Sequence, residues 1–296
     1  MESVPRRLPL RLPCRPPFAA DTLLSFLSAR AVPGVEEVHD GTYRRGILTT
    51  GGGTTVITIR PHPAEGYVTV NAPAGDVPDL PRLERGARQA FDLDADPLVI
   101  DAALARDAEL GSLVHLTPGM RVPGNFDAFE LVVRAIFGQQ VSVPGARTSL
   151  GRFAARFGTP LDEPSGNITR LFPNAEQVAE IDPEALEMPR GRAEAIRRVA
   201  ELVAAGQLDP SGEAPLEETL RILGEVRGIG PWTLAYVAMR ALRDPDAFLV
   251  GDLGVRKGFR SLGLPSGPGE ILARAERWRP WRAYAVMHLW HAPRVS

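Results

Sequence analysis

The pattern of hydrophobic residues changes near Pro78, and this change limits the folds that the chain can adopt. Before it, runs rich in Thr, Val, Ile and Tyr at residues 43–49, 54–60 and 67–71 are separated by turns containing glycine or proline, which is typical of strands. A helix is predicted over residues 21–30, where apolar side chains recur at helical spacing. After Pro78 the periodicity stays helical, with Pro and Gly at most boundaries.

Short strands joined by hairpin-length turns imply an antiparallel sheet that the helix covers on one face. We therefore predict an α+β fold, with an antiparallel β-sheet domain over residues 1–78 and an all-α body over residues 79–296. Proline-rich connectors at 159–164 and 209–215 are interpreted as surface loops. The helices predicted in the body span residues 79–92, 96–106, 126–139, 143–157, 191–205, 216–226, 231–242, 253–262 and 279–291.

The composition excludes several classes of protein. Of the 296 residues, 44% are hydrophobic and 24% are charged, as in ordinary globular proteins. No apolar run approaches the roughly 20 residues of a membrane span, and the N-terminal segment lacks the apolar core of a signal peptide. The single cysteine, Cys14, cannot form an intrachain disulfide or a site that needs several thiolates. We expect a cytoplasmic monomer that does not associate with membranes.

Charge gives little information about partners. The net charge is −2, although the chain from Leu216 onward has twelve Arg and Lys against eight Asp and Glu. Such a local excess fits a DNA-binding face and fits an ordinary solvated surface equally well. Charge therefore does not decide between them.

Residues 216–242 predict two helices joined by a turn that contains two glycines. Gly228 and Gly230 permit positive φ and the close approach of another backbone. Pro231 suits the first position of the second helix, and Ile229 is expected to insert between the two helices. The second helix would then begin with unpaired N–H groups that point outward.

Outward N–H groups at a helix start suit a phosphate, to which Thr233 would add its hydroxyl. A turn that only ends a helix is the alternative. The sequence Val-Arg-Gly-Ile-Gly-Pro-Trp-Thr resembles the helix–hairpin–helix of the DNA glycosylase superfamily. The resemblance implies that main-chain amides of the hairpin grip the DNA backbone. It also implies a monovalent cation, Na⁺ or K⁺, on the backbone carbonyls of Gly224, Val226 and Ile229.

Asp252 lies downstream of the hairpin, in a loop over residues 244–257. Taken alone, it would be the N-cap of a helix that begins at Leu253. Members of the superfamily place their catalytic aspartate here, so the resemblance assigns that role to Asp252. The two roles are compatible, because a helix N-terminus favours an ionised carboxylate. A fixed anion would stabilise the oxocarbenium-like sugar that forms when a C1′–N bond breaks.

Two missing features narrow the resemblance. Bifunctional members attack the sugar with a lysine just after the hairpin, but the matching residue here is Trp232, and the only lysine is Lys257. Members similar to endonuclease III bind an iron–sulfur cluster through several cysteines, which this chain lacks. We therefore expect a monofunctional enzyme without a cofactor.

The chain resembles AlkA-type 3-methyladenine DNA glycosylases through segments at residues 24–38, 121–130, 135–142 and 276–290. The resemblance implies that it flips alkylated bases, of the 3-methyladenine and 7-methylguanine type, out of double-stranded DNA and hydrolyses the N-glycosidic bond. It also implies an aromatic cleft for the flipped base, where an electron-rich ring face attracts a cationic purine. By position, the cleft residues are Phe26, Trp232, Tyr236 and Trp290.

Two positions differ from the best-known family member. Leu253 replaces a tyrosine, and Gln140 stands where an apolar wedge fills the space left by the flipped base. His288 and His291 have no acidic or cysteine partner nearby in the sequence and are interpreted as packing or surface residues. Two alternatives stay open: a glycosylase for deaminated or oxidised bases that uses the same Asp252, and a non-catalytic helix–hairpin–helix module that only binds DNA.

Overall fold

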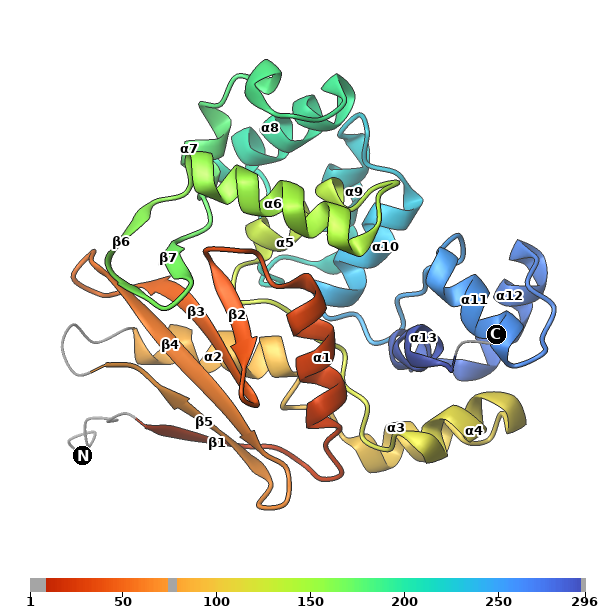
Figure 1. Cartoon of the computed structure of the whole chain (residues 1–296). Coiled ribbons are helices and arrows are strands. Elements are labelled where there is room, and N and C mark those ends of the chain that lie inside the picture. Colours follow the sequence, from red (N-terminus) through yellow and green to blue (C-terminus); the bar gives the residue numbers. More distant parts are fainter. Residues whose placement is uncertain (1–8, 74–78, 294–296) are drawn as a thin grey trace.

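An antiparallel sheet of five strands forms the N-terminal part of the computed structural model, which describes residues 9–73 and 79–293 (Figure 1). The strand order is β1-β5-β4-β3-β2, and every neighbouring pair is antiparallel. Helix α1 (Ala20–Arg30) confirms the helix predicted at residues 21–30. It connects β1 to β2, two strands of four residues each that were not predicted. The strands are β1 (Leu10–Pro13), β2 (Glu36–His39), β3 (Thr42–Leu48), β4 (Thr54–His62) and β5 (Tyr67–Asn71).

One face of the sheet is buried because apolar residues alternate along its strands. Ile57 and Ile59 of β4 are fully buried, as are Val68 and Val70 of β5, and residues two apart point to the same face. Helix α2 (Leu80–Phe91) adds leucine, alanine and phenylalanine side chains to this core. The domain boundary predicted at residue 78 lies outside the described residues, and the core of the sheet continues past it into α2.

The loop predicted at 159–164 is wrong, because a short hairpin forms there from β6 (Pro160–Ser165) and β7 (Ile168–Arg170). Gly166 makes its turn at φ +64°. Proline content argued against a strand, but each strand of a two-stranded sheet is an edge strand, where proline is tolerated. Leu161 and Ile168 are buried against Val56 of the main sheet, which stabilises the hairpin.

The rest of the described chain is helical, which confirms the predicted fold class. Helices α4 (Ala108–Leu116), α7 (Ala175–Ala179) and α12 (Pro268–Ala275) were not predicted. The helices of this body are α3 (Pro97–Leu104), α4 (Ala108–Leu116), α5 (Ala128–Phe137), α6 (Val143–Phe157), α7 (Ala175–Ala179), α8 (Arg190–Ala204), α9 (Leu216–Glu225), α10 (Pro231–Arg240), α11 (Leu253–Ser261), α12 (Pro268–Ala275) and α13 (Arg282–His291).

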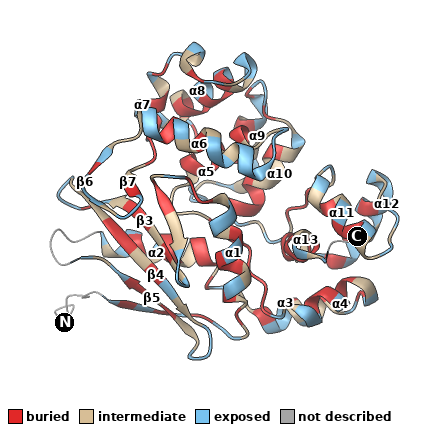
Figure 2. Ribbon diagram, viewed as in Figure 1, coloured by how far each residue is buried: buried red, intermediate tan, exposed pale blue. Residues whose placement is uncertain are grey.

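The helices pack into two groups with separate hydrophobic cores. One core lies among α5 to α10, and the other among α3, α4 and α11 to α13, to which Ala238 and Met239 of α10 also belong. Figure 2 shows in red the buried residues of both groups. Phe26 of α1 belongs to the second core, whereas Tyr236 of α10 packs against both. The residues predicted for the aromatic cleft therefore lie where α1, α10 and α13 meet. Among the described residues, no helix has the length and apolar character needed to cross a membrane.

A buried set of charges joins the sheet to α5. This inter-domain charge cluster consists of Glu36, Arg45, Glu130 and Arg134, and each arginine contacts both glutamates. The four ion-pair distances run from 2.8 to 4.0 Å. Burial would raise the pKa of Glu36, but the guanidiniums of Arg134 and Arg45 outweigh it and hold that pKa below its usual value.

Candidate active site

Asp252 caps the N-terminus of α11, and its carboxylate accepts three N–H bonds. The backbone amide of Val255 donates to Oδ1 at 2.9 Å, as an N-cap interaction does. The indole of Trp290 donates to the same oxygen at 2.8 Å, and the indole of Trp232 donates to Oδ2 at 2.9 Å. Asp252 forms no ion pair within the described part of the chain. The side chain is thus a fixed, half-buried hydrogen-bond acceptor.

The local sequence explains how two indoles reach one carboxylate. Trp232 is the second residue of α10, directly after Pro231, so it lies at the hairpin end of that helix. Trp290 crosses the first turn of α11, where a Cβ on Gly254 would lie 2.5 Å from the indole ring. Glycine at position 254 therefore leaves the space through which Trp290 reaches Asp252.

The four aromatic residues predicted for the cleft come together beside Asp252. The rings of Phe26 and Trp290 stack at 6.0 Å with an interplanar angle of 12°. Trp232 and Tyr236 stack at 5.2 Å and 23°, and Tyr236 lies 6.3 Å from Trp290. Residues from three helices far apart in the sequence thus form one aromatic cluster next to the carboxylate.

Two arginines belong to the cleft, although the sequence argument missed them. The guanidinium carbon of Arg30 lies 3.7 Å from the centroid of Phe26 and 5.8 Å from that of Trp290. Arg240 donates to the Tyr236 hydroxyl at 2.6 Å and lies over the rings of Phe26 and Tyr236. Each arginine follows a cleft aromatic by four residues on the same helix, and this spacing places the two side chains on one face. That spacing was visible in the sequence.

These arginines make the cleft electropositive around Tyr236. Burial by itself would raise the pKa of the Tyr236 hydroxyl, but the guanidiniums of Arg240 and Arg30 outweigh it, so that pKa lies below its usual value. Burial in turn lowers the pKa of Arg30. Neither arginine forms an ion pair within residues 9–73 and 79–293.

The two glycines of the hairpin differ. Gly228 has φ +98°, and a Cβ there would lie 3.2 Å from the carbonyl oxygen of Gly191. Gly230 has φ −99°, which any residue can adopt, and the space where its Cβ would lie is open. The expectation of positive φ is therefore confirmed for Gly228 and wrong for Gly230. The missing side chain of Gly230 leaves open space at the surface.

The other hairpin residues are partly as expected. Ile229 is 8% exposed and packs in the core beside α9 and α10, and its amide donates to the carbonyl of Val226. Among the described residues, no backbone carbonyl accepts from the amides of Gly228 or Gly230. Thr233 is 2% exposed and accepts a hydrogen bond from Gln139, so its hydroxyl lies inside and does not face outward as expected.

The remaining predicted positions differ in their exposure. Gln140 is exposed between α5 and α6, with φ +57°. Leu253 is 68% exposed, and Lys257 is exposed on α11. His288 is 1% exposed, and burial lowers its pKa to about 4, whereas His291 is exposed. The described residues contain no group of three or more His, Cys, Asp or Glu side chains that could hold a metal ion.

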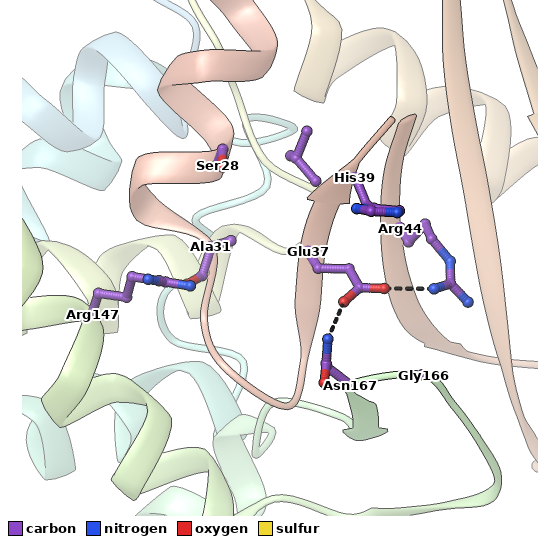
Figure 3. A pocket seen from close by; sticks show the side chains of 9 residues that line it. Ser28, Ala31, Glu37, His39, Arg44, Arg147, Gly166 and Asn167 are labelled. Carbon is purple, nitrogen blue, oxygen red and sulfur yellow. Dashed lines mark hydrogen bonds and ion pairs between the residues drawn. The ribbon is translucent and has the colours of Figure 1, made fainter. Parts of the chain in front are cut away.

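A cavity of about 420 Å³ lies away from this cluster, next to α1, β2, β3 and α6 (Figure 3). Its lining includes Glu37, Arg44, Arg147 and Asn167. Arg44 and Asn167 both donate to Glu37, as the dashed lines in Figure 3 mark. None of the four cleft aromatics lines this cavity, and neither does Asp252. We therefore place the candidate reaction at the aromatic cluster.

Comparison with known proteins identifies the family of the chain. The family described as the AlkA N-terminal domain matches residues 9–127, and the HhH-GPD superfamily base excision DNA repair protein family matches residues 133–283. Over 280 residues the chain is 37% identical to DNA-3-methyladenine glycosylase 2 of Escherichia coli, covering 94% of this chain and 95% of that protein.

A second relative is longer. The chain is 41% identical over 282 residues to the "Probable bifunctional transcriptional activator/DNA repair enzyme AlkA" of Mycobacterium tuberculosis. This match covers 95% of the chain and 56% of the relative, so the chain spans about half the length of that protein.

A solved structure shares the fold. The 3-methyladenine DNA glycosylase of Archaeoglobus fulgidus superposes with a TM-score of 0.81 at 22% identity, covering 95% of this chain and 97% of that one. Sequence and structure comparisons thus agree over nearly the whole chain. The chain belongs to the HhH-GPD superfamily of base excision DNA repair proteins and carries an AlkA N-terminal domain.

Proposed function

We propose that this protein is a monofunctional DNA glycosylase that removes alkylated bases from double-stranded DNA. The observation that carries the proposal is Asp252, a carboxylate that forms no ion pair in the described chain. It is held by two indoles that belong to a cluster of four aromatic residues. The Escherichia coli relative, named as a DNA-3-methyladenine glycosylase, supports this substrate class. Damaged duplex DNA is the proposed partner.

The proposed mechanism begins with the DNA backbone. The free amides of Gly228 and Gly230 bind a phosphate, and the open surface at Gly230 allows its close approach. The damaged nucleotide rotates out of the helix, and its base stacks within the aromatic cluster. This pose brings the C1′ atom to Asp252.

The chemical step breaks the bond between C1′ and the base nitrogen. The bonding electron pair leaves with the base, which is a good leaving group when alkylation has made it cationic. The Asp252 anion stabilises the positive charge that develops on the sugar. A water oxygen then bonds to C1′ and releases one proton, which leaves an intact abasic site.

The residues present favour hydrolysis over a covalent amine intermediate. Trp232 occupies the position of the lysine nucleophile and donates to Asp252 instead. Lys257 is exposed on α11. Since no other lysine exists in the chain, no Schiff base with C1′ is expected.

A monovalent cation is compatible with the hairpin. Gly224 lies in the last turn of α9, where helix carbonyls lack intrahelical partners. The Val226 carbonyl already accepts from the Ile229 amide, and a carbonyl oxygen has a second lone pair. The carbonyls of Gly224, Val226 and Ile229 would hold Na⁺ or K⁺, which would supply positive charge near the bound phosphate.

One observation favours deaminated bases as additional substrates. Arg30 places a hydrogen-bond donor and a positive charge against the rings of Phe26 and Trp290. A neutral base with an exocyclic oxygen could accept a hydrogen bond from this guanidinium. Hypoxanthine is therefore the second lesion to assay.

Base-release measurements on duplexes containing 7-methylguanine, 3-methyladenine or hypoxanthine test the proposed function. We expect release of at least the methylated bases, strand breakage only after hot alkali, and no enzyme–DNA adduct after borohydride. Binding of lesion DNA without release of any base would leave only the DNA-binding module. A borohydride adduct abolished by Lys257→Ala would reassign the protein to the lyase subclass.

A further inference from the structure

Gln139 connects two parts of the proposed DNA-binding surface that are distant in the sequence. Its side-chain amide nitrogen donates to the carbonyl oxygen of Gly228 at 3.0 Å and to the hydroxyl oxygen of Thr233 at 2.9 Å. A primary amide has two N–H donors, so these two bonds use both. Gln139 thereby grips the hairpin on both sides of its turn.

The backbone of Gln139 is held as well. Arg192, in the first turn of α8, donates to the Gln139 carbonyl at 2.8 Å. Gly191 lies beside Arg192, and its carbonyl oxygen is 3.2 Å from the place where a Gly228 Cβ would lie. The start of α8, the hairpin turn and Gln139 therefore form one contact region.

The next residue, Gln140, is the candidate wedge. It is exposed and has φ +57°, a backbone conformation that side chains other than glycine rarely adopt. Helix α5 ends at Phe137, and Ser142 caps α6, so only a short segment connects the two helices. The direction of the Gln140 side chain thus depends on how Gln139 is held.

We propose that Gln139 is a positioning residue that fixes Gln140 relative to the phosphate-binding hairpin. The hairpin can then bind the DNA backbone while Gln140 fills the space left by the flipped base, because the two are held in a fixed relative position. This inference rests on the proposed function. Gln139 is half-buried, so water can replace its hydrogen bonds at little cost to folding, but water cannot hold Gln140 in place.

The test is a double-mutant cycle between Gln139→Met and Gln140→Ala. Gln139→Met keeps the length of the side chain and adds no charge, but it cannot donate to Gly228 or Thr233. Insertion is read from 2-aminopurine placed opposite a stable abasic analogue, a signal that does not require base release. Single-turnover release of 7-methylguanine is measured in parallel. Gln207→Met, at an exposed glutamine beyond α8, is the matched control.

We expect Gln139→Met to reduce the 2-aminopurine response and base release by about tenfold or more, because loss of positioning is costly in a fixed site. Affinity for undamaged duplex should change little. In the Gln140→Ala background the same substitution should have almost no further effect, since coupled residues are not additive.

Equal effects of Gln139→Met in both backgrounds would overturn the inference, as would a wild-type response. The inference would also be overturned if the loss of 2-aminopurine response and base release matched the fraction of unfolded protein in thermal melts. Gln139 would then have only a structural role. Thr233→Val, which removes one of the two acceptors, should give a smaller loss of the same kind and replaces Gln139→Met if that variant does not fold. If the wild type fills the space but releases no base, the proposed function fails while this inference stands.

Discussion

Two groups of partly or fully buried charges in this protein are held in opposite ways. In the inter-domain charge cluster, every carboxylate contacts an arginine and every arginine contacts two carboxylates. The second group, the cleft charges, consists of Arg30, Arg240 and Asp252, and none of them forms an ion pair within the described residues. Neutral groups hold them instead: aromatic faces, a tyrosine hydroxyl, indole and backbone N–H groups and, for Arg240, the backbone carbonyls of Pro123 and Gly124.

The difference separates folding from function. A charge that is paired inside the protein has little interaction left for a ligand, whereas one held by neutral groups keeps its field for a phosphate, a base or a developing cation. The two groups are also connected, because Arg134 donates to the backbone carbonyl of Arg30 at 2.7 Å. The paired cluster thus fixes the end of α1 that carries Phe26 and Arg30.

The largest expected effect comes from breaking the paired cluster. Arg45→Met leaves Glu130 with only one arginine partner and Glu36 with a weaker set, so the free energy of unfolding should fall by about 3–5 kcal/mol. Arg44→Met, which removes a more accessible pair with Glu37, should cost about 1 kcal/mol or less. Urea denaturation measures both. Equal losses of unfolding free energy in the two variants would mean that ion pairs in the buried cluster stabilise the protein no more than the accessible pair does.

His288 extends the comparison to a buried group whose two ring nitrogens have no hydrogen-bond partner among residues 9–73 and 79–293. Burial lowers its pKa from 6.5 to about 4, so the unfolded chain binds more protons in that range and stability falls as pH drops from 6.5 to 4. Across this window the loss attributable to His288 is up to about 3 kcal/mol. His288→Leu should remove this loss of stability at low pH.

Comparing the free energy of unfolding of His288→Leu with that of wild type at each pH isolates the contribution of His288. Burial raises the pKa of Asp92 to about 6, so its contribution falls as pH rises from 3.8 to 6, in the opposite direction. Asp92 is present in both proteins, so its contribution cancels in the difference between their free energies of unfolding. Parallel curves of unfolding free energy for wild type and His288→Leu would contradict the assignment.

The two hairpin glycines also separate an effect on folding from an effect on DNA binding. Gly228→Val combines a strained φ of +98° with crowding against Gly191, and we expect it to destabilise the protein by about 2 kcal/mol. Gly230→Val introduces no strain and should leave the melting temperature nearly unchanged. It should nevertheless weaken binding to all DNA sequences about equally, because phosphate contacts do not read bases. Weakened binding to one lesion alone would speak against a phosphate-binding hairpin.

Trp290→Phe tests how the cleft holds its anion. Phenylalanine keeps a ring next to Phe26 but removes the N–H that donates to Asp252 at 2.8 Å. Single-turnover base release should fall by about tenfold, the effect of one hydrogen bond to a charged group. Trp281→Phe, outside the cleft, is the control. An unchanged rate in Trp290→Phe would show that the indole contributes only its ring.

Much of the architecture could be predicted from the sequence because it depends on local periodicity. Apolar residues alternate along β4 and β5 and recur at helical spacing in the body, so these strands and helices can be predicted from their own sequence. The β6–β7 hairpin, in contrast, depends on packing against Val56 of the sheet. In the site, Asp252 and the four aromatics followed from the family resemblance. Their hydrogen bonds did not, because they connect separate helices.

The errors in the predicted hairpin have the same cause. Thr233 was expected to face outward, but Gln139, which is 94 residues away in the sequence, occupies its hydroxyl. The open space at Gly230 likewise depends on what surrounds the turn, and a Gly-x-Gly pattern alone cannot show which glycine needs positive φ. Arg30 and Arg240 were the exception, since their spacing from Phe26 and Tyr236 was visible.

The central claim is that the paired charges serve the fold and the unpaired charges serve the reaction. A direct test compares two isosteric neutralisations, Asp252→Asn and Glu130→Gln, by melting temperature and by single-turnover release of 7-methylguanine. Asp252→Asn should reduce base release by at least about a hundredfold while DNA affinity holds or increases, and its melting temperature should fall less than that of Glu130→Gln. Glu130→Gln should lower the melting temperature and leave release by the folded protein close to wild type. Near-wild-type release by Asp252→Asn would contradict the account.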